Sequence, residues 1–158
     1  MKDQLIKRSQ IVLLMLSGLI SAPLIAATPA ADDVTVSKPY VRAVPPGQPN
    51  SAAFMQLQNK GATPHAVMKA ESPVAKVVEL HTHINEGGVM KMRQIKKIDI
   101  PAQGETMLKP GGLHVMFLGL ESELKPGQSV PVTLIYEDGS KVTIQATVRK
   151  MQMHMKQK

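Results

Sequence analysis

Cysteine is absent from this 158-residue chain. Its absence excludes disulfides, iron–sulfur clusters, thiolate metal sites and a cysteine nucleophile. Tryptophan is absent too, and aromatic residues make up only 3% of the chain, which argues against nucleic-acid binding through base stacking. Methionine is abundant instead, with 11 residues. Any soft metal ligand in this chain must therefore be something other than a thiol.

Positive charge exceeds negative charge, and the formal net charge is +7. Much of the excess lies near the carboxyl end, at Arg149, Lys150, Lys156 and Lys158. Charge gathered at one end of a chain is more typical of a solvated tail than of a nucleic-acid patch. We therefore expect no nucleic-acid partner.

The amino terminus has the three parts of a secretory signal peptide. A basic start with Lys2 and Arg8 precedes an apolar run from Ile11 to Ile20, and small residues follow. Serine, glycine and proline interrupt the apolar stretch, which is short for a membrane span of about 20 residues. We expect residues 1–27 to be a signal peptide, with the cut between positions 26 and 31. The mature protein is then periplasmic or otherwise extracytoplasmic, with no stable membrane insertion.

The rest of the chain reads as short strands separated by turn residues, and no window shows a convincing helical apolar period. This pattern predicts an all-β fold, an antiparallel Greek-key sandwich or barrel, in one domain over residues 28–149. Asp138-Gly139 is a strong hairpin signal because Asp-Gly supplies positive φ. The expected strands are 34–36, 40–44, 52–58, 65–71, 76–84, 89–95, 98–100, 106–108, 114–118, 130–136 and 141–148.

Histidine and methionine gather in the predicted hairpin KVVELHTHI-NEGG-VMKMRQI. With Asn85–Gly88 as the turn, His83 faces Met90 and His81 faces Met92. Side chains alternate along a strand, so all four project from one face. Directly opposed Cβ atoms lie about 4.5–5.5 Å apart. An imidazole and a thioether can therefore converge on one ion across this hairpin.

A second His/Met pair follows in Gly112-Leu113-His114-Val115-Met116, where two-residue spacing places His114 and Met116 on one strand face. Thioether and imidazole together select Cu(I) over zinc, magnesium or calcium. The pattern predicts a copper site built from His81, Met92, His114 and Met116. His83 and Met90 are either further ligands or groups beside the ligands.

The remaining methionines have a simpler interpretation, because methionine is a flexible core filler. We expect Met55, Met68 and Met107 to pack in the core. A lone histidine is more often a polar residue with satisfied hydrogen bonds than a metal ligand, and we interpret His65 in that way.

The motif spacing resembles the periplasmic copper chaperone family PCu(A)C, whose pattern is His, ten residues, Met, twenty-one residues and His-x-Met. Ten residues separate His81 from Met92 here, and twenty-one separate Met92 from His114. The resemblance covers roughly residues 34–148. It implies a cupredoxin-like β-barrel with a Cu(I) site made by the two His/Met pairs. It also implies a copper-receiving partner, such as a cytochrome c oxidase subunit or another copper chaperone.

Residues 150–158 form a Met/His-rich carboxyl tail that we expect to be disordered, since it follows the last strand without turn residues or an apolar period. Many members of the resembled family carry such a tail. Our hypothesis is that it captures copper, including Cu(II) through its histidine. Its candidate ligands are Met151, Met153, His154 and Met155.

A binding and transfer protein, a copper chaperone, fits these features better than an enzyme. A blue-copper electron carrier needs a cysteine ligand, no serine has a nucleophile motif, and no phosphate-binding glycine loop precedes a helix. We expect no enzymatic activity. The alternatives left open are a copper storage or resistance protein and a metal-free extracytoplasmic interaction domain. We expect a monomer, with a metal-bridged dimer as the alternative.

Overall fold

The computed structural model describes residues 28–150, which form one short helix and ten strands, so the all-β prediction is confirmed. Within these residues, no helix is long and apolar enough to cross a membrane. The elements are α1 (Ala30–Asp33), β1 (Val34–Arg42), β2 (Asn50–Asn59), β3 (His65–Glu71), β4 (Ala75–Glu86), β5 (Val89–Gln94), β6 (Ile98–Ile100), β7 (Glu105–Leu108), β8 (His114–Leu120), β9 (Ser129–Tyr136) and β10 (Lys141–Arg149).

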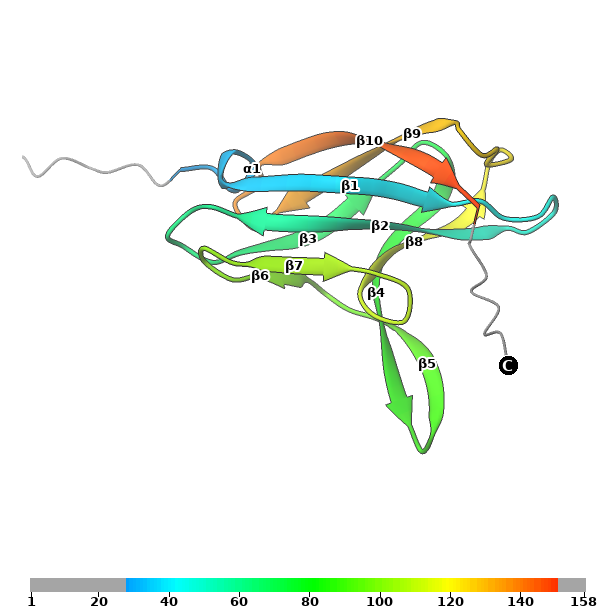
Figure 1. Ribbon diagram of the computed structural model, residues 1–158, viewed down its shortest axis with the longest axis horizontal. Helices are drawn as coiled ribbons and strands as arrows, with labels where there is room; N and C mark the ends of the chain where they lie inside the picture. Colours follow the sequence, from blue (N-terminus) through cyan, green and yellow to red (C-terminus); the bar gives the residue numbers. More distant parts are fainter. Residues whose placement is uncertain (1–27, 151–158) are drawn as a thin grey trace, which may run out of the picture.

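The strands form one sheet in the order β5-β4-β8-β2-β1-β10-β9-β3-β6, and β7 pairs with β2. β3 also contacts β4 and β6 contacts β7, although neither pair is hydrogen-bonded in the sheet, so the sheet curls around one interior (Figure 1). Neighbouring strands are antiparallel except β1 and β10, which pair in parallel. This pair departs from the antiparallel prediction, and it places Arg149 opposite Arg42.

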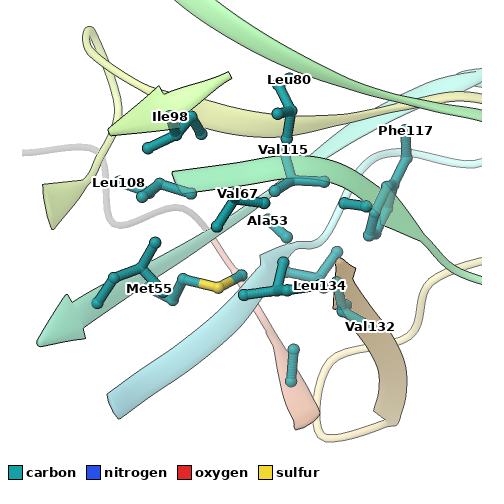
Figure 2. Packing of buried hydrophobic residues seen from close by; sticks show 14 of the residues in the cluster. Ala53, Met55, Val67, Leu80, Ile98, Leu108, Val115, Phe117, Val132 and Leu134 are labelled. Carbon is teal, nitrogen blue, oxygen red and sulfur yellow. The ribbon is translucent and has the colours of Figure 1, made fainter. Parts of the chain in front are cut away.

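The interior of the curl is one hydrophobic core to which every strand except β5 contributes. Residues are buried at every second position of β9, as expected when one face of a strand packs inward. Phe117, Val115 and Leu134 lie in this core (Figure 2). Because β5 buries nothing, the β4–β5 hairpin projects from the sheet (Figure 1).

β1 is continuous, whereas the sequence predicts two short strands broken by Pro39. Proline has no N–H to give to a strand ladder, so it needs an edge or a bulge. The structure supplies a bulge: the β1–β2 register shifts between Ser37 and Tyr40, and Lys38 has a φ of 51°. The strand therefore passes the proline without ending.

The expected core methionines divide between buried and exposed positions. Met55 is buried as predicted, but Met68 and Met107 are exposed, so that prediction is wrong for both. Met68 lies in a register shift of the β3–β9 pairing between Val67 and Lys69, which disturbs the alternation of faces. Met107 occupies an exposed position of β7, where its own alternation points it outward.

His65 is a buried residue with both ring nitrogens engaged, which confirms its interpretation as a satisfied polar residue. Its Nδ1 lies 2.6 Å from Glu137 Oε1, and its Nε2 lies 3.2 Å from Asp33 Oδ2. Asp138 accepts a hydrogen bond from the Ala30 N–H at 2.7 Å. These contacts join α1 to the β9–β10 turn.

The β4–β5 hairpin forms with a register different from the predicted one. Gly87 and Gly88 are the two turn residues, with φ of 61° and 85°, and β4 runs on to Glu86. A two-residue turn with both residues at positive φ is strongly favoured in tight hairpins. Asn85 Oδ1 accepts the Gly88 N–H at 2.8 Å, which fixes the turn further.

As a consequence, His83 pairs with Met92, and His81 pairs with Gln94. The predicted pairs, His83 with Met90 and His81 with Met92, are therefore wrong by two positions. Because the side-chain period of a strand is two, this slip keeps every residue on its predicted face. It moves Met92 two residues toward the hairpin end, from opposite His81 to opposite His83.

Candidate metal centre

The two predicted His/Met segments meet on one face of the sheet. β4 and β8 are hydrogen-bonded neighbours, and His81 pairs with His114 across them. The ring centroids of His81 and His83 lie 5.7 Å and 5.2 Å from that of His114. A cavity of about 160 Å³ opens on this face, and it is lined by Arg42, Ala52, Phe54, His83, Met92, Pro110, Gly111, His114 and Met116.

His114 is the buried imidazole of this cavity. Its Nδ1 lies 3.0 Å from the Gly112 carbonyl oxygen. A carbonyl only accepts, so Nδ1–H donates and the Nε2 lone pair is free for a metal. Burial lowers the pKa of His114, and the charges of His83, His81 and Arg42 lower it further against the Gly112 hydrogen bond. The lowered pKa favours the neutral ring, which is the form that binds metal.

His81 lies beside this cavity without being among its lining residues. Its Nε2 is 2.7 Å from Glu79 Oε2, and its Nδ1 is buried with no hydrogen-bond partner. Buried polar atoms are rarely left unpaired in folded proteins, so each exception needs a reason. A metal ion bound at Nδ1 supplies one.

His83 faces the cavity directly, opposite Met92. Its Nδ1 approaches the same Gly112 oxygen at 3.4 Å, a longer contact than the one made by His114. The ring thus lies near His114, and its contact with Gly112 is weak. The structure brings His83 closer to the site than the sequence indicates.

The two thioethers differ sharply in environment. Met116 is 8% exposed and packs with Ala52 and Phe54 in a small second cluster. Met92 lies on the projecting hairpin and is 51% exposed. Met90, on the same face two residue pairs further out, is 55% exposed, opposite Asn85 and outside the cavity lining. The cavity thus has a buried thioether inside and an exposed one at its edge.

The donor set of this face is suited to a soft cation. Within residues 28–150, no group of three or more His, Asp or Glu side chains could hold a metal ion, so the thioethers are needed to complete a site. Imidazole with thioether is a Cu(I) donor set, and carboxylate-preferring ions find little here. The free Nε2 of His114 and the orphaned Nδ1 of His81 fit such an ion.

Two residues of the site were not predicted from sequence. Glu79 precedes His81 by two positions, which places it on the same strand face. That spacing could have indicated a contact. Arg42 reaches the cavity from β1, and only the long-range β1–β2–β8 pairing brings it there. The predicted tail ligands Met151, Met153, His154 and Met155 lie outside the described residues.

Comparisons with known proteins agree with this fold. The family model described as "Putative lipoprotein LpqE-like" matches residues 34–148. The "Putative lipoprotein Lxx21020" of Leifsonia xyli subsp. xyli is 37% identical over 142 residues, covering 87% of this chain and 84% of that protein.

Solved structures of PCuAC domains share the cupredoxin-like β fold. The solution structure of apo-DR1885 from Deinococcus radiodurans is 33% identical with a TM-score of 0.61, covering 96% of this chain and 97% of that chain. The structure of CuI-DR1885 is 38% identical with a TM-score of 0.59, covering 70% and 74%. The copper-bound PCuAC domain from PmoF2 has a TM-score of 0.66 at 22% identity, covering 78% and 97%. Because only 22% of residues are identical, the similarity to the PmoF2 domain supports the fold and nothing further.

Proposed function

This chain belongs to the LpqE-like family, and from that premise we propose that it is an extracytoplasmic chaperone for Cu(I). One observation carries the proposal. His83, Met92, His114 and Met116, from three strands, line a single surface cavity. The related protein DR1885 has been solved with Cu(I) bound, at 38% identity to this chain. Thioether sulfur is a soft ligand, and together with imidazole it favours Cu(I) in a site that has no thiolate.

The proposed ligands are His81, Met92, His114 and Met116, with His83 as an auxiliary imidazole. Three of the four strand ligands reach the ion from fixed positions, and Met92 reaches it from the exposed hairpin. Met90 lies two residue pairs further out and would contact an ion only on its way to or from the cavity.

Copper is the cargo of this protein in our proposal, so the site must release it as well as bind it. The exposed Met92 is the ligand that a partner can displace first, because its thioether lies at the surface. Thioethers bind without the deprotonation that thiols require, and they do not form disulfides in an oxidising compartment. Transfer then proceeds by ligand exchange, with no oxidation or reduction of the cargo and no catalysed reaction. The proposed recipient is a cytochrome c oxidase subunit or another copper chaperone.

Export fits the predicted signal peptide and the lipoprotein description of the family. The sequence contains no cysteine, so it offers no thiol to which a lipid could be attached. We therefore propose a periplasmic or other extracytoplasmic protein that is not anchored through a cysteine.

Anaerobic titration against a chromogenic Cu(I) chelator tests the proposal. The mature protein should bind Cu(I) far more tightly than Zn(II), and His114→Gln should weaken binding about 100-fold or more, because it removes the buried imidazole. Met107→Leu, at an exposed methionine outside the cavity, is the matched control and should bind like the wild type.

X-ray absorption of the Cu(I) form, in a variant lacking residues 151–158, should show mixed nitrogen and sulfur neighbours. A spectrum with only nitrogen or oxygen neighbours would contradict the proposed ligands. Incubation of the loaded protein with an apo copper-accepting domain separates transfer from storage. A chaperone gives up its copper within the experiment, whereas a storage protein keeps it.

A further inference from the structure

Glu79 is a charged residue in contact with a proposed ligand, and the proposed function gives it no role. It lies on β4 opposite Met116, as His81 lies opposite His114. The four side chains share one face of the β4–β8 pair, since pairs two positions apart project alike. The carboxylate is partly buried, and its oxygen Oε2 lies 2.7 Å from His81 Nε2.

We propose that Glu79 is a positioning residue that selects Nδ1 as the copper-binding atom of His81; this inference rests on the proposed function. A carboxylate accepts hydrogen bonds only, so its contact with Nε2 places the proton on Nε2. In the neutral ring, the lone pair is then on Nδ1. Nδ1 is the buried atom of His81 that has no hydrogen-bond partner.

The arrangement is the reverse of the one at His114, whose Nδ1–H donates to the Gly112 carbonyl and whose Nε2 is free. The two opposed imidazoles therefore present different nitrogens. His81 and His114 can share one ion only if the donor nitrogen of each ring faces the space between the two rings. The hydrogen bonds to Glu79 and to the Gly112 carbonyl hold the rings in these different orientations. A hydrogen-bonded carboxylate also makes the imidazole a stronger donor.

The distribution of charge around the cavity also supports a positioning role for Glu79. Arg42 lines the cavity, and a bound Cu(I) adds a second positive charge beside it. Glu79 is the carboxylate in direct contact with a proposed ligand among the described residues, and it offsets this charge. Carboxylate is a hard ligand that Cu(I) disfavours, so Glu79 acts through His81 and does not compete for the ion.

The test compares Glu79→Ala and Glu79→Gln in the mature protein. Long-range proton–nitrogen correlation spectra of the apo protein should show His81 protonated at Nε2 in the wild type and in Glu79→Gln, whose amide oxygen still accepts. Glu79→Ala should lose this single tautomer. Cu(I) affinity should fall about 10- to 100-fold in Glu79→Ala and by less in Glu79→Gln.

Glu86→Ala is the matched control, because Glu86 is on the same strand and its carboxylate forms ion pairs with Lys91 and Arg93. It should leave the Cu(I) affinity unchanged. In the loaded wild type, the His81 signal that moves should be Nδ1, and the His114 signal that moves should be Nε2.

An unchanged His81 tautomer together with unchanged affinity in Glu79→Ala would overturn the proposal. Equal losses of affinity in Glu79→Gln and Glu79→Ala, with the tautomer intact in Glu79→Gln, would overturn it too, because charge alone would then explain the effect. Should Glu79→Ala fail to fold, the near-isosteric Glu79→Gln decides by the same two measurements. A wild type that binds no Cu(I) would instead overturn the proposed function, and the apo spectra would still test the Glu79–His81 contact.

Discussion

His83 and Met92 are directly opposed across the β4–β5 hairpin, and both line the cavity that contains His114 and Met116. The pair lies where the projecting hairpin leaves the sheet, so one thioether of the proposed site sits on an element that buries none of its own residues. Met116, the other thioether, is packed against Phe54 and Ala52. Copper binding can therefore depend on the packed Met116, and copper release on the exposed Met92.

Replacing Met92 by leucine tests this division. Met92→Leu should lower Cu(I) affinity about 10- to 100-fold, because the sulfur donor is lost. The free energy of unfolding should change by less than about 1.5 kcal/mol, since leucine has a similar volume and the position is exposed. Chelator competition and thermal unfolding measure the two effects. Equal affinity for Met92→Leu and the Met107→Leu control would exclude Met92 as a ligand.

The hairpin turn should also affect copper binding, because it sets the register that places Met92 opposite His83. Gly87 has a φ of +61° and open space around it, so Gly87→Ala introduces backbone strain without a clash. The strain costs about 1–2 kcal/mol. We expect faster amide hydrogen exchange in the hairpin and a several-fold lower Cu(I) affinity.

Gly112→Ala is the comparison for this prediction. Gly112 is not at positive φ, and an added Cβ would meet its nearest atoms at 3.6 Å, an ordinary contact. Its carbonyl, which holds His114, is unchanged by the substitution. Gly112→Ala should thus keep both the hairpin protection and the affinity. A larger loss of Cu(I) affinity in Gly112→Ala than in Gly87→Ala would show that the hairpin turn does not control the site.

The sequence predicts the faces of the hairpin better than its pairing, and the physical reason lies in the turn. Asn85–Gly88 can close several turns, and only the folded chain selects Gly87 and Gly88, both at positive φ. A slip of two positions makes Met92 the partner of His83 instead of His81, but it leaves all three side chains on the same face of the hairpin. Motif spacing therefore predicted which residues gather on the face of the candidate site, although the predicted register was wrong.

Contacts made by distant segments could not be predicted in this way. Arg42 enters the cavity because β1 lies two strands from β8 in the sheet, a relationship that no local pattern encodes. The parallel pairing of β1 with β10 is equally long-range. The continuous β1 depends on a bulge at Lys38, which β2 pairing stabilises on both sides.

The His65 cluster predicts a pH dependence of stability far from the metal face. Burial acts to lower the pKa of His65, but its hydrogen bonds to Glu137 and Asp33 outweigh burial and raise the pKa above 6.5. A raised histidine pKa stabilises the folded state at pH values below the unfolded value of 6.5, and the benefit is lost as pH rises through the folded pKa. Thermal unfolding of the apo protein should therefore show this contribution declining above about pH 6.5.

Glu137 sets the acid limit of the same cluster. Burial acts to raise its pKa, but hydrogen bonds from the Ala66 N–H and from His65 lower it below 4.5. Its contribution is present above pH 4.5 and is lost as pH falls through the folded pKa. The cluster is thus most stabilising between these two limits.

The variant His65→Gln is needed to isolate the contribution of His65 to stability. Burial lowers the pKa of His114, so His114 gives stability the opposite pH dependence near pH 6.5. Below pH 6.5, the variant should be less stable than the wild type by about 1–3 kcal/mol, as expected when buried hydrogen bonds to a charged group are lost. The difference should shrink as pH rises. A difference independent of pH would show that His65 contributes by packing alone.

The described part of the chain ends beside a residue that lines the cavity. Arg149 pairs with Arg42, which lines the cavity, and the Arg149 carbonyl accepts the Ala43 N–H at 2.8 Å. The chain therefore continues past Lys150 from a point fixed next to the metal face. A tethered ligand set has an effective concentration in the millimolar range, so soft donors beyond this point can hold copper that the strand site then takes up.

Replacing all four tail ligands at once should leave the Cu(I) affinity of the strand site unchanged and remove a weaker second equivalent, because Met151, Met153, His154 and Met155 are absent from the proposed strand site. Loading from a weak Cu(I) donor should be slower than in the wild type, and Cu(II) binding should be lost with His154. Stopped-flow loading and anaerobic stoichiometry measure these effects. A variant with lysine replacements at Gln152 and Gln157 controls for changes in tail charge and should load like the wild type. Unchanged stoichiometry and unchanged loading in the four-ligand variant would leave the strand site as the sole copper site of the protein.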